Sequence, residues 1–112
     1  MTATESELIL SVTTTVGSLD AARELARQIL AEKLAACVQL DAEVTSLYRW
    51  KGKQHEDREV RLVIKTLPAR EQALRDLFGR LHPYELPQFL CVAMRASPAY
   101  AAWVRSEVTL PG

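Results

Sequence analysis

The chain has 112 residues, 48% of them hydrophobic and 25% charged, which is enough for one globular domain over residues 1–112 with a single core. Lysine plus arginine balances aspartate plus glutamate at 14 each, so the basic surplus that marks nucleic-acid binders is missing. The apolar runs are shorter than the roughly 18 residues of a membrane span, and residues 1–7 lack the basic start of a signal peptide. We therefore expect a cytoplasmic protein with no nucleic-acid or membrane partner, whose Cys37 and Cys91 are reduced thiols.

The N-terminal part predicts a strand followed by a helix. Residues 7–15 are rich in β-branched side chains, as in a buried strand, and Gly17 ends that strand. Ser18 can cap the helix that follows, in which apolar side chains recur at helical spacing. We expect this helix to run to about residue 34.

Residues 36–50 predict a long strand, because apolar side chains at even positions alternate with polar ones at odd positions. This alternation puts Tyr48 and Trp50 on the same apolar face as the earlier even-numbered residues. About fifteen residues is long for a strand, so we expect a bend or bulge near residues 41–43.

After a turn at Gly52, residues 56–65 predict the next strand. Glu59 and Lys65 share one face of it but lie roughly 20 Å apart, so they cannot pair with each other. A charge on an inward strand face needs a partner, and we expect that partner to be Tyr84, Glu85 or a group of a neighbouring subunit. Lys65 is thus a candidate for a polar site.

The C-terminal part predicts a helix, a strand and a last short helix. The first helix opens at Pro68 and stops at His82-Pro83. Its apolar stripe consists of Leu74, Leu77, Phe78 and Leu81. Residues 88–94 predict a strand with Cys91 in the core, and Pro98 starts a helix that carries Tyr100 and Trp103 to about residue 108.

The element order βαββαβ plus a C-terminal helix predicts an α+β protein. It is the split βαβ, ferredoxin-like arrangement, an antiparallel sheet with two helices on one face. The other face stays open unless something covers it, so an apolar strand that reaches Tyr48 and Trp50 predicts self-association. Tyr48 and Trp50, together with Trp103 on the last helix, are candidates for the interface between subunits. The alternative is that Tyr48 and Trp50 stack on a ligand.

Residues 81–87, Leu-His-Pro-Tyr-Glu-Leu-Pro, gather an imidazole, a phenol and a carboxylate in a segment that two prolines stiffen. Three interpretations stay open. His82 and Glu85 are metal ligands, or the segment with Tyr84 walls a pocket between subunits, or it is a structural loop. A second polar cluster, residues 55–57, is interpreted as a solvated turn, with a weak surface metal site as the alternative.

Cys37 is the other candidate metal ligand. Its thiolate would suit copper or zinc, but a closed zinc site needs about four ligands and no C-x-x-C pair is present. The alternative, a small apolar residue at the start of a strand, stays open.

Five motifs in order resemble the CutA family, which is linked to divalent-cation tolerance. They are Ala36-Cys37-Val38, the S-x-Y-x-W-x-G hairpin at residues 46–52, Glu59 with Ile64-Lys65-Thr66, H-P-Y-E-L-P at residues 82–87, and Tyr100-x-x-Trp103. Two departures are Gln39, where the family often has asparagine, and residues 41–43, which lack the proline often found there. The resemblance implies a ferredoxin-like subunit in a homotrimer, similar in architecture to the PII signalling proteins, with reported binding of copper and other divalent metals.

Two functions follow as expectations. The first is a homotrimer that binds a divalent metal, Cu(II) above all because copper heads the affinity order, with Zn(II) second and Cys37, His82 and Glu85 as ligands. The alternative is a PII-like sensor that holds a small anionic ligand in an intersubunit pocket of Glu59, Lys65 and Tyr84, although the four glycines form no phosphate loop. We expect no enzyme, since residues 15–18 lack the arginine of acylphosphatases and no catalytic triad is recognisable. The strand at residues 58–64 lacks the aromatic residues of RNA-binding modules of this topology.

Overall fold

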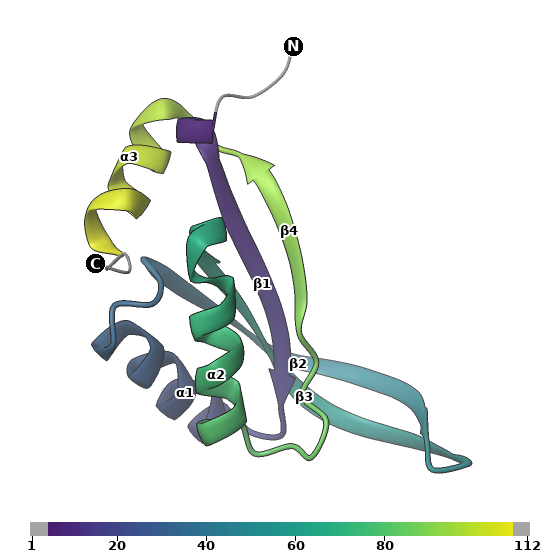
Figure 1. Ribbon diagram of the computed structural model, residues 1–112. Helices are drawn as coiled ribbons and strands as arrows, with labels where there is room; N and C mark the ends of the chain where they lie inside the picture. Colours follow the sequence, from purple (N-terminus) through teal and green to yellow (C-terminus); the bar gives the residue numbers. More distant parts are fainter. Residues whose placement is uncertain (1–4, 109–112) are drawn as a thin grey trace.

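The computed structural model describes residues 5–108, which fold as four strands and three helices (Figure 1). The strands are β1 (Leu8–Val16), β2 (Cys37–Trp50), β3 (Lys53–Thr66) and β4 (Leu90–Arg95). The helices are α1 (Leu19–Ala31), α2 (Glu71–Leu81) and α3 (Pro98–Glu107), with short 3-10 turns η1 (Glu5–Glu7) and η2 (Pro68–Arg70). The strands form one antiparallel sheet in the order β2-β3-β1-β4, which confirms the predicted α+β class.

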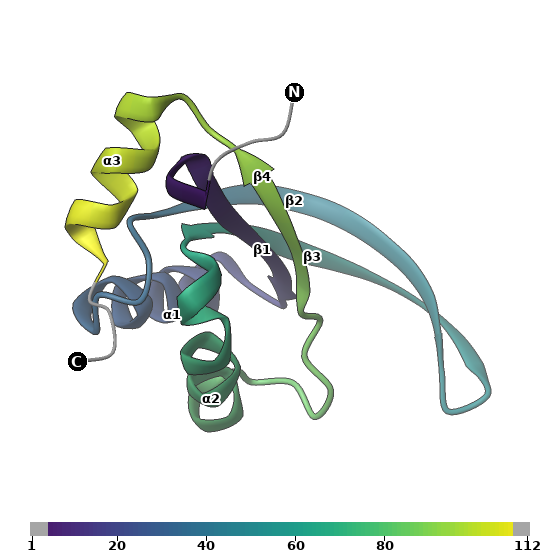
Figure 2. The ribbon, with the colours of Figure 1, turned by 45° about the horizontal axis from the view of Figure 1, so that its top comes forward.

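Helices α1 and α2 cover one face of the sheet, and we call the opposite face the open face. The main core lies between this pair of helices and the sheet, with Val12, Leu62 and Ile64 fully buried against Ile29 and Leu77. Helix α3 lies apart from α1 and α2, at the end of the sheet where β1 begins (Figure 2). There it forms a second cluster, made of Ile9, Leu67, Ala101, Val104 and Val108.

Helix α1 begins as predicted but ends earlier. The Ala21 N–H donates to Ser18 Oγ at 3.1 Å, which confirms Ser18 as the cap. The predicted end near residue 34 is wrong, because the helix stops at Ala31 and Lys33 takes a left-handed φ of 55°. That conformation reverses the chain and turns Leu34 into the core.

Helix α2 starts later than predicted but ends as predicted, with His82 as its C-cap. Pro68 opens the 3-10 turn η2, and the α-helix starts only at Glu71. Leu74, Leu77 and Phe78 of the predicted stripe are buried, but Leu81 is 43% exposed because it lies in the last turn, where the helix leaves the sheet.

A bulge in β2 overturns the prediction that all its even-numbered side chains share one face. Ala42 lies opposite Val60, whereas Val44 lies opposite Glu59, so Glu43 is an extra residue without a cross-strand partner. Because facing residues share a face of the sheet, the even positions before the bulge point to the helices. The even positions after it, which include Tyr48 and Trp50, point to the open side. The bulge lies where the length of the strand predicted one.

Strand β4 is an edge strand whose side chains are all exposed, so the prediction of a core position for Cys91 is wrong. The Cys91 Sγ lies 3.6 Å from Glu71 Oε1 instead of packing in an apolar interior. On the open face of this strand, Leu90 and Val92 are each 58% exposed and Met94 is 38% exposed. Across residues 5–108, no helix has the length and apolar character that crossing a membrane requires.

Candidate functional site

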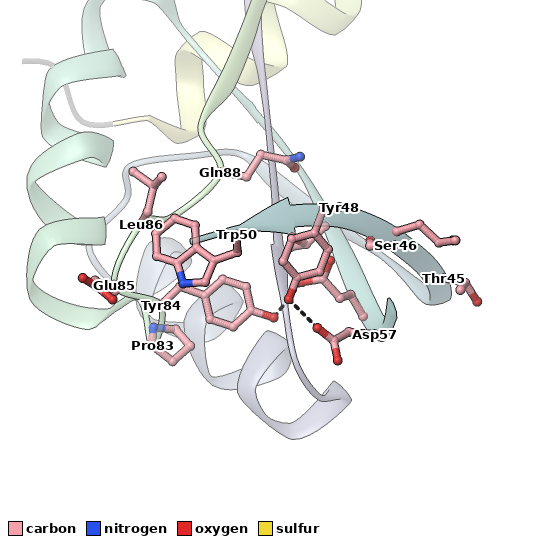
Figure 3. Close-up of a pocket in the computed structure, with 13 residues that line it drawn as sticks. Thr45, Ser46, Tyr48, Trp50, Asp57, Pro83, Tyr84, Glu85, Leu86 and Gln88 are labelled. Atoms are coloured by element: carbon pink, nitrogen blue, oxygen red, sulfur yellow. Dashed lines mark hydrogen bonds between the residues drawn. The ribbon is translucent and has the colours of Figure 1, made fainter. Parts of the chain in front are cut away.

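The β2–β3 hairpin and the loop of residues 82–88 enclose a pocket of about 810 Å³, which we call the hairpin pocket (Figure 3). The hairpin extends past the helices, and the loop joins α2 to β4 (Figure 1). The residues that line the pocket are Thr15, Thr45, Ser46, Leu47, Tyr48, Trp50, Asp57, Glu59, Pro83, Tyr84, Glu85, Leu86 and Gln88. The pocket therefore joins the S-x-Y-x-W-x-G and H-P-Y-E-L-P motifs, which contribute Tyr48, Trp50 and Tyr84 to its lining.

His82 fixes the start of the loop through both ring nitrogens. The Tyr84 N–H donates to Nδ1 at 3.1 Å, so in the neutral ring Nε2 carries the proton and donates to Thr14 Oγ1 at 3.0 Å. Burial lowers the pKa of His82, although the Thr15 backbone and the charge of Glu59 act in the opposite direction. The ring also lies between Phe78 and Tyr84, with centroid distances of 5.3 Å to each. This arrangement ties the loop to β1 and α2.

Tyr84 confirms the expectation that Glu59 needs a partner from another element. The Tyr84 hydroxyl donates to Glu59 Oε2 at 2.6 Å, and Glu59 is only 9% exposed. Burial, together with the hydrogen bond to this carboxylate, raises the pKa of Tyr84. The phenol therefore stays protonated and remains the donor of this hydrogen bond.

A second phenol–carboxylate pair lies further along the hairpin. The Tyr48 hydroxyl donates to Asp57, and this bond raises the pKa of Tyr48 (Figure 3). The His55 ring stacks on Tyr48 with centroids 5.2 Å apart. Residues 55–57 are therefore more than the expected solvated turn, because Asp57 is engaged by Tyr48 and lines the pocket.

Lys51 closes the rim of the pocket at the hairpin turn. Its Nζ lies 3.5 Å from Glu85 Oε2 and 5.5 Å from the centroid of the Trp50 ring. Both Lys51 and Glu85 are largely exposed, so the ion pair contributes little to folding stability. Its position shows that an ammonium group is accommodated between the indole and a carboxylate.

The structure does not bring the three predicted metal ligands together within one chain. Cys37 lies opposite Lys65 on the open face, whereas His82 contacts Thr14 on the helix side and Glu85 pairs with Lys51. Within residues 5–108, no three His, Cys, Asp or Glu side chains are grouped so that they could hold a metal ion. A metal site built on the predicted residues thus needs ligands from a second copy.

The predicted pocket residues are brought together only in part. Glu59 and Tyr84 meet, but Lys65 does not line the hairpin pocket, and its Nζ donates to Gln39 Oε1 at 3.1 Å. The predicted interface residues Tyr48 and Trp103 are each 42% exposed, and Trp50 is half-buried in the pocket. Whether these three contact another subunit stays a prediction.

Sequence reasoning missed Asp57 and Thr14 as members of this site. The pairing of the hairpin strands could have revealed Asp57. Ser46 lies opposite Asp57, and Tyr48 is the next residue after Ser46 on the same face of the sheet, within reach of that carboxylate. Thr14 lies on the core face of β1, where its hydroxyl is fully buried and needs a partner, which His82 supplies.

Comparison with known proteins gives the family. The profile described as CutA1 divalent ion tolerance protein matches residues 10–107. Human Protein CutA is 41% identical over 85 residues, which cover 75% of this chain and 48% of that protein. The Protein CutA homolog of Xenopus laevis is 40% identical over 84 residues, covering 74% and 56%. The chain thus matches about half the length of these animal relatives.

A bacterial relative and two solved structures are covered more fully. The divalent-cation tolerance protein CutA of Salmonella newport (strain SL254) is 39% identical over 88 residues, 78% of this chain and 76% of that protein. CutA1 from Oryza sativa superposes with a TM-score of 0.89 at 30% identity, covering 95% of this chain and 98% of that one. The divalent cation tolerance protein of Thermus thermophilus gives 0.86 at 33% identity, covering 90% and 99%. The chain belongs to the CutA1 divalent ion tolerance protein family.

Proposed function

We propose that this protein forms a homotrimer in the cytoplasm and that the trimer binds a divalent metal ion, Cu(II) first and Zn(II) second, in response to metal ions and without catalysis. The observation that carries the proposal is the uncovered apolar part of the open face, where Leu90, Val92 and Met94 are exposed beside an unpaired sheet edge. Apolar side chains next to an unpaired edge favour association with another copy. The family supplies the link to divalent ions.

Assembly would also resolve the arrangement of the candidate ligands. Zinc sites use about three or four protein ligands, and one described chain offers no such group of His, Cys, Asp or Glu. His82 has both ring nitrogens engaged inside its own chain, so a metal at that ring would have to displace Thr14 or the Tyr84 N–H. Cys37, on the open face beside Lys65, is better placed to meet a ligand from a second copy.

Native mass spectrometry tests assembly and metal binding together. Chelated protein should give a trimer, and one equivalent of Cu(II) or Zn(II) per chain should add metal in a fixed stoichiometry. Cys37→Ser should lower the copper uptake, and Cys91→Ser is the matched control because that thiol is exposed on the edge strand. A monomer at low micromolar concentration would contradict the assembly, and equal uptake by both cysteine variants would remove Cys37 as a ligand.

Trp50 should contribute to the contact between subunits. Trp50→Ala is expected to lower the mass fraction of trimer, because buried aromatic side chains dominate interface energies. Leu30→Ala is the control, since Leu30 is a 43% exposed apolar residue on α1, away from the open face. A trimer as stable as wild type after Trp50→Ala would contradict the interface assignment.

A PII-like sensor of a small anion is the second candidate, and one observation favours it. Lys65 is half-buried on the open face, its Nζ bonds to the neutral Gln39, and it forms no ion pair with any residue of the described chain. An ammonium group that has no carboxylate partner in the described chain favours an anionic partner. Titration with ATP or inorganic phosphate should give heat that Lys65→Met abolishes and Lys53→Met, on the hairpin, retains.

A further inference from the structure

The side chains that line the hairpin pocket carry negative charge, whereas a site for an anion would carry positive charge. Three carboxylates, those of Asp57, Glu59 and Glu85, line it, and among the described residues no lysine, arginine or histidine does so. Such a concave surface, partly shielded from water, concentrates negative potential and attracts cations. The pocket therefore differs in chemistry from the surroundings of Lys65.

The two phenols add to this negative character. The hydroxyls of Tyr48 and Tyr84 donate hydrogen bonds to Asp57 and Glu59, so neither hydroxyl is free to donate to an anion. Each carboxylate accepts one hydrogen bond from a phenol hydroxyl and keeps further lone pairs for a second donor. The rings of Trp50 and both tyrosines also line the pocket, and the faces of such rings attract ammonium and guanidinium groups (Figure 3).

Lys51 gives independent evidence that this environment accepts an organic cation. Its ammonium lies 5.5 Å from the Trp50 centroid and 3.5 Å from Glu85 Oε2, at the rim of the pocket. The chain thus places one of its own cations where carboxylate and indole meet. An incoming cation of the same kind would compete with Lys51 at the rim and extend to Asp57 and Glu59.

The size and geometry of the pocket select an organic cation over a bare metal ion. The pocket, of about 810 Å³, lies in the range of small-molecule sites. A metal ion needs oxygen, nitrogen or sulfur ligands that converge, and no three candidate ligands do so in the described chain. We infer that the hairpin pocket binds a small organic cation, with a guanidinium or alkylammonium group between the aromatic rings and the carboxylates of Asp57 and Glu59.

The two tryptophans make this inference directly measurable. In a ¹H–¹⁵N spectrum of the full-length protein, Trp50 and Trp103 give the only two indole N–H signals. Titration with butylguanidinium at constant ionic strength should move the Trp50 signal in a saturable way and leave that of Trp103, on α3, in place. Butylurea, the neutral isostere, should move neither. Equal shifts with butylurea, or no movement of the Trp50 signal, would overturn the inference.

Variants that change the charge around the pocket test whether negative charge raises the affinity for butylguanidinium. Asp57→Asn should weaken butylguanidinium binding about two- to fivefold, as expected for loss of one solvent-accessible ion pair. Glu56→Gln removes the same charge from the neighbouring position of β3, does not line the pocket, and should leave the affinity unchanged. Lys51→Gln should tighten binding by a similar factor, because it removes the competing ammonium. Weaker binding to Lys51→Gln, or equal losses in Asp57→Asn and Glu56→Gln, would also overturn the inference.

The same titration shows whether the cation that fills the pocket is a free ligand or a side chain of another copy. If butylguanidinium binds and the assembled mass in native mass spectrometry stays constant, the pocket takes a free cation. If binding lowers that mass, the pocket is filled in the assembly by an arginine or lysine of another copy. Failure of trimer formation or of metal uptake would refute the proposed function and leave this test unaffected, because every residue that lines the described pocket belongs to one chain.

Discussion

Replacing Tyr84 by phenylalanine should destabilise the protein through Glu59. The change removes the hydroxyl that donates at 2.6 Å to a carboxylate that is only 9% exposed. A hydrogen bond to a charged group contributes about 1.5–3 kcal/mol, and an unpaired buried acceptor is expensive. Because Tyr84 itself is 36% exposed, water can replace part of the lost bond. We therefore expect the free energy of unfolding to fall by about 1–2 kcal/mol.

The assay is urea unfolding of wild type and variant at one protein concentration, since assembly makes apparent stability depend on concentration. Tyr48→Phe is the matched control, because it removes the same hydroxyl from a phenol–carboxylate pair on the exposed hairpin. Tyr48→Phe should lower the free energy of unfolding clearly less than Tyr84→Phe does. The double variant Tyr84→Phe with Glu59→Gln should lose less than the sum of the two single changes. Equal effects of the two tyrosine variants, or additive effects in the double variant, would refute the assignment of a buried Tyr84–Glu59 bond.

Two further changes test the loop and the core. Burial keeps the pKa of His82 below its ordinary value of 6.5, so the unfolded chain takes up a proton first and the free energy of unfolding should fall as pH drops below about 6.5. His82→Gln should flatten this dependence, and a pH profile identical to that of wild type would contradict the role of His82. Leu77→Ala should cost about 2–5 kcal/mol because Leu77 is fully buried. Leu81→Ala, 43% exposed in the same predicted stripe, should change the urea midpoint little, and similar losses at both positions would contradict the described core.

The architecture could be predicted because each element carries a local signal. Helical spacing, the Ser18 cap and the strand alternation on β3 depend only on near neighbours in the chain. The predictions fail where contacts between residues far apart in the sequence determine the structure. The exposure of Cys91 depends on β4 being an edge strand with no further strand beside it, which the apolar composition of residues 88–94 does not reveal. The early end of α1 depends on Lys33 adopting a conformation usually left to glycine.

The candidate site was predictable only as separate pieces. The cost of burying a charge predicts a partner for Glu59, with Tyr84 as one of three candidates, and the structure selects Tyr84. Lys65 was grouped with them because it shares a strand face with Glu59, but that face extends past the pocket, so Lys65 bonds to Gln39 instead. The interface and metal assignments depend on a second copy of the chain, and they stay predictions.

The bulge at Glu43 explains why Tyr48 and Trp50 lie on the open face although the alternation over residues 36–50 groups them with Val38 and Leu40, and deleting Glu43 tests what else the extra residue does. Without Glu43, Ala42 still meets Val60 and Val44 still meets Glu59, so Tyr48 keeps its side of the sheet. What the deletion removes is the local bend that a bulge gives its strand. If that bend brings the hairpin back to the loop, the deletion should separate Lys51 from Glu85 and shift the Trp50 indole signal. Butylguanidinium binding should then be lost, while the urea midpoint stays near that of wild type because the core residue Val60 keeps its pairing with Ala42. An intact pocket in the deletion variant would show instead that the ordinary twist of β2 and β3 supplies the curvature.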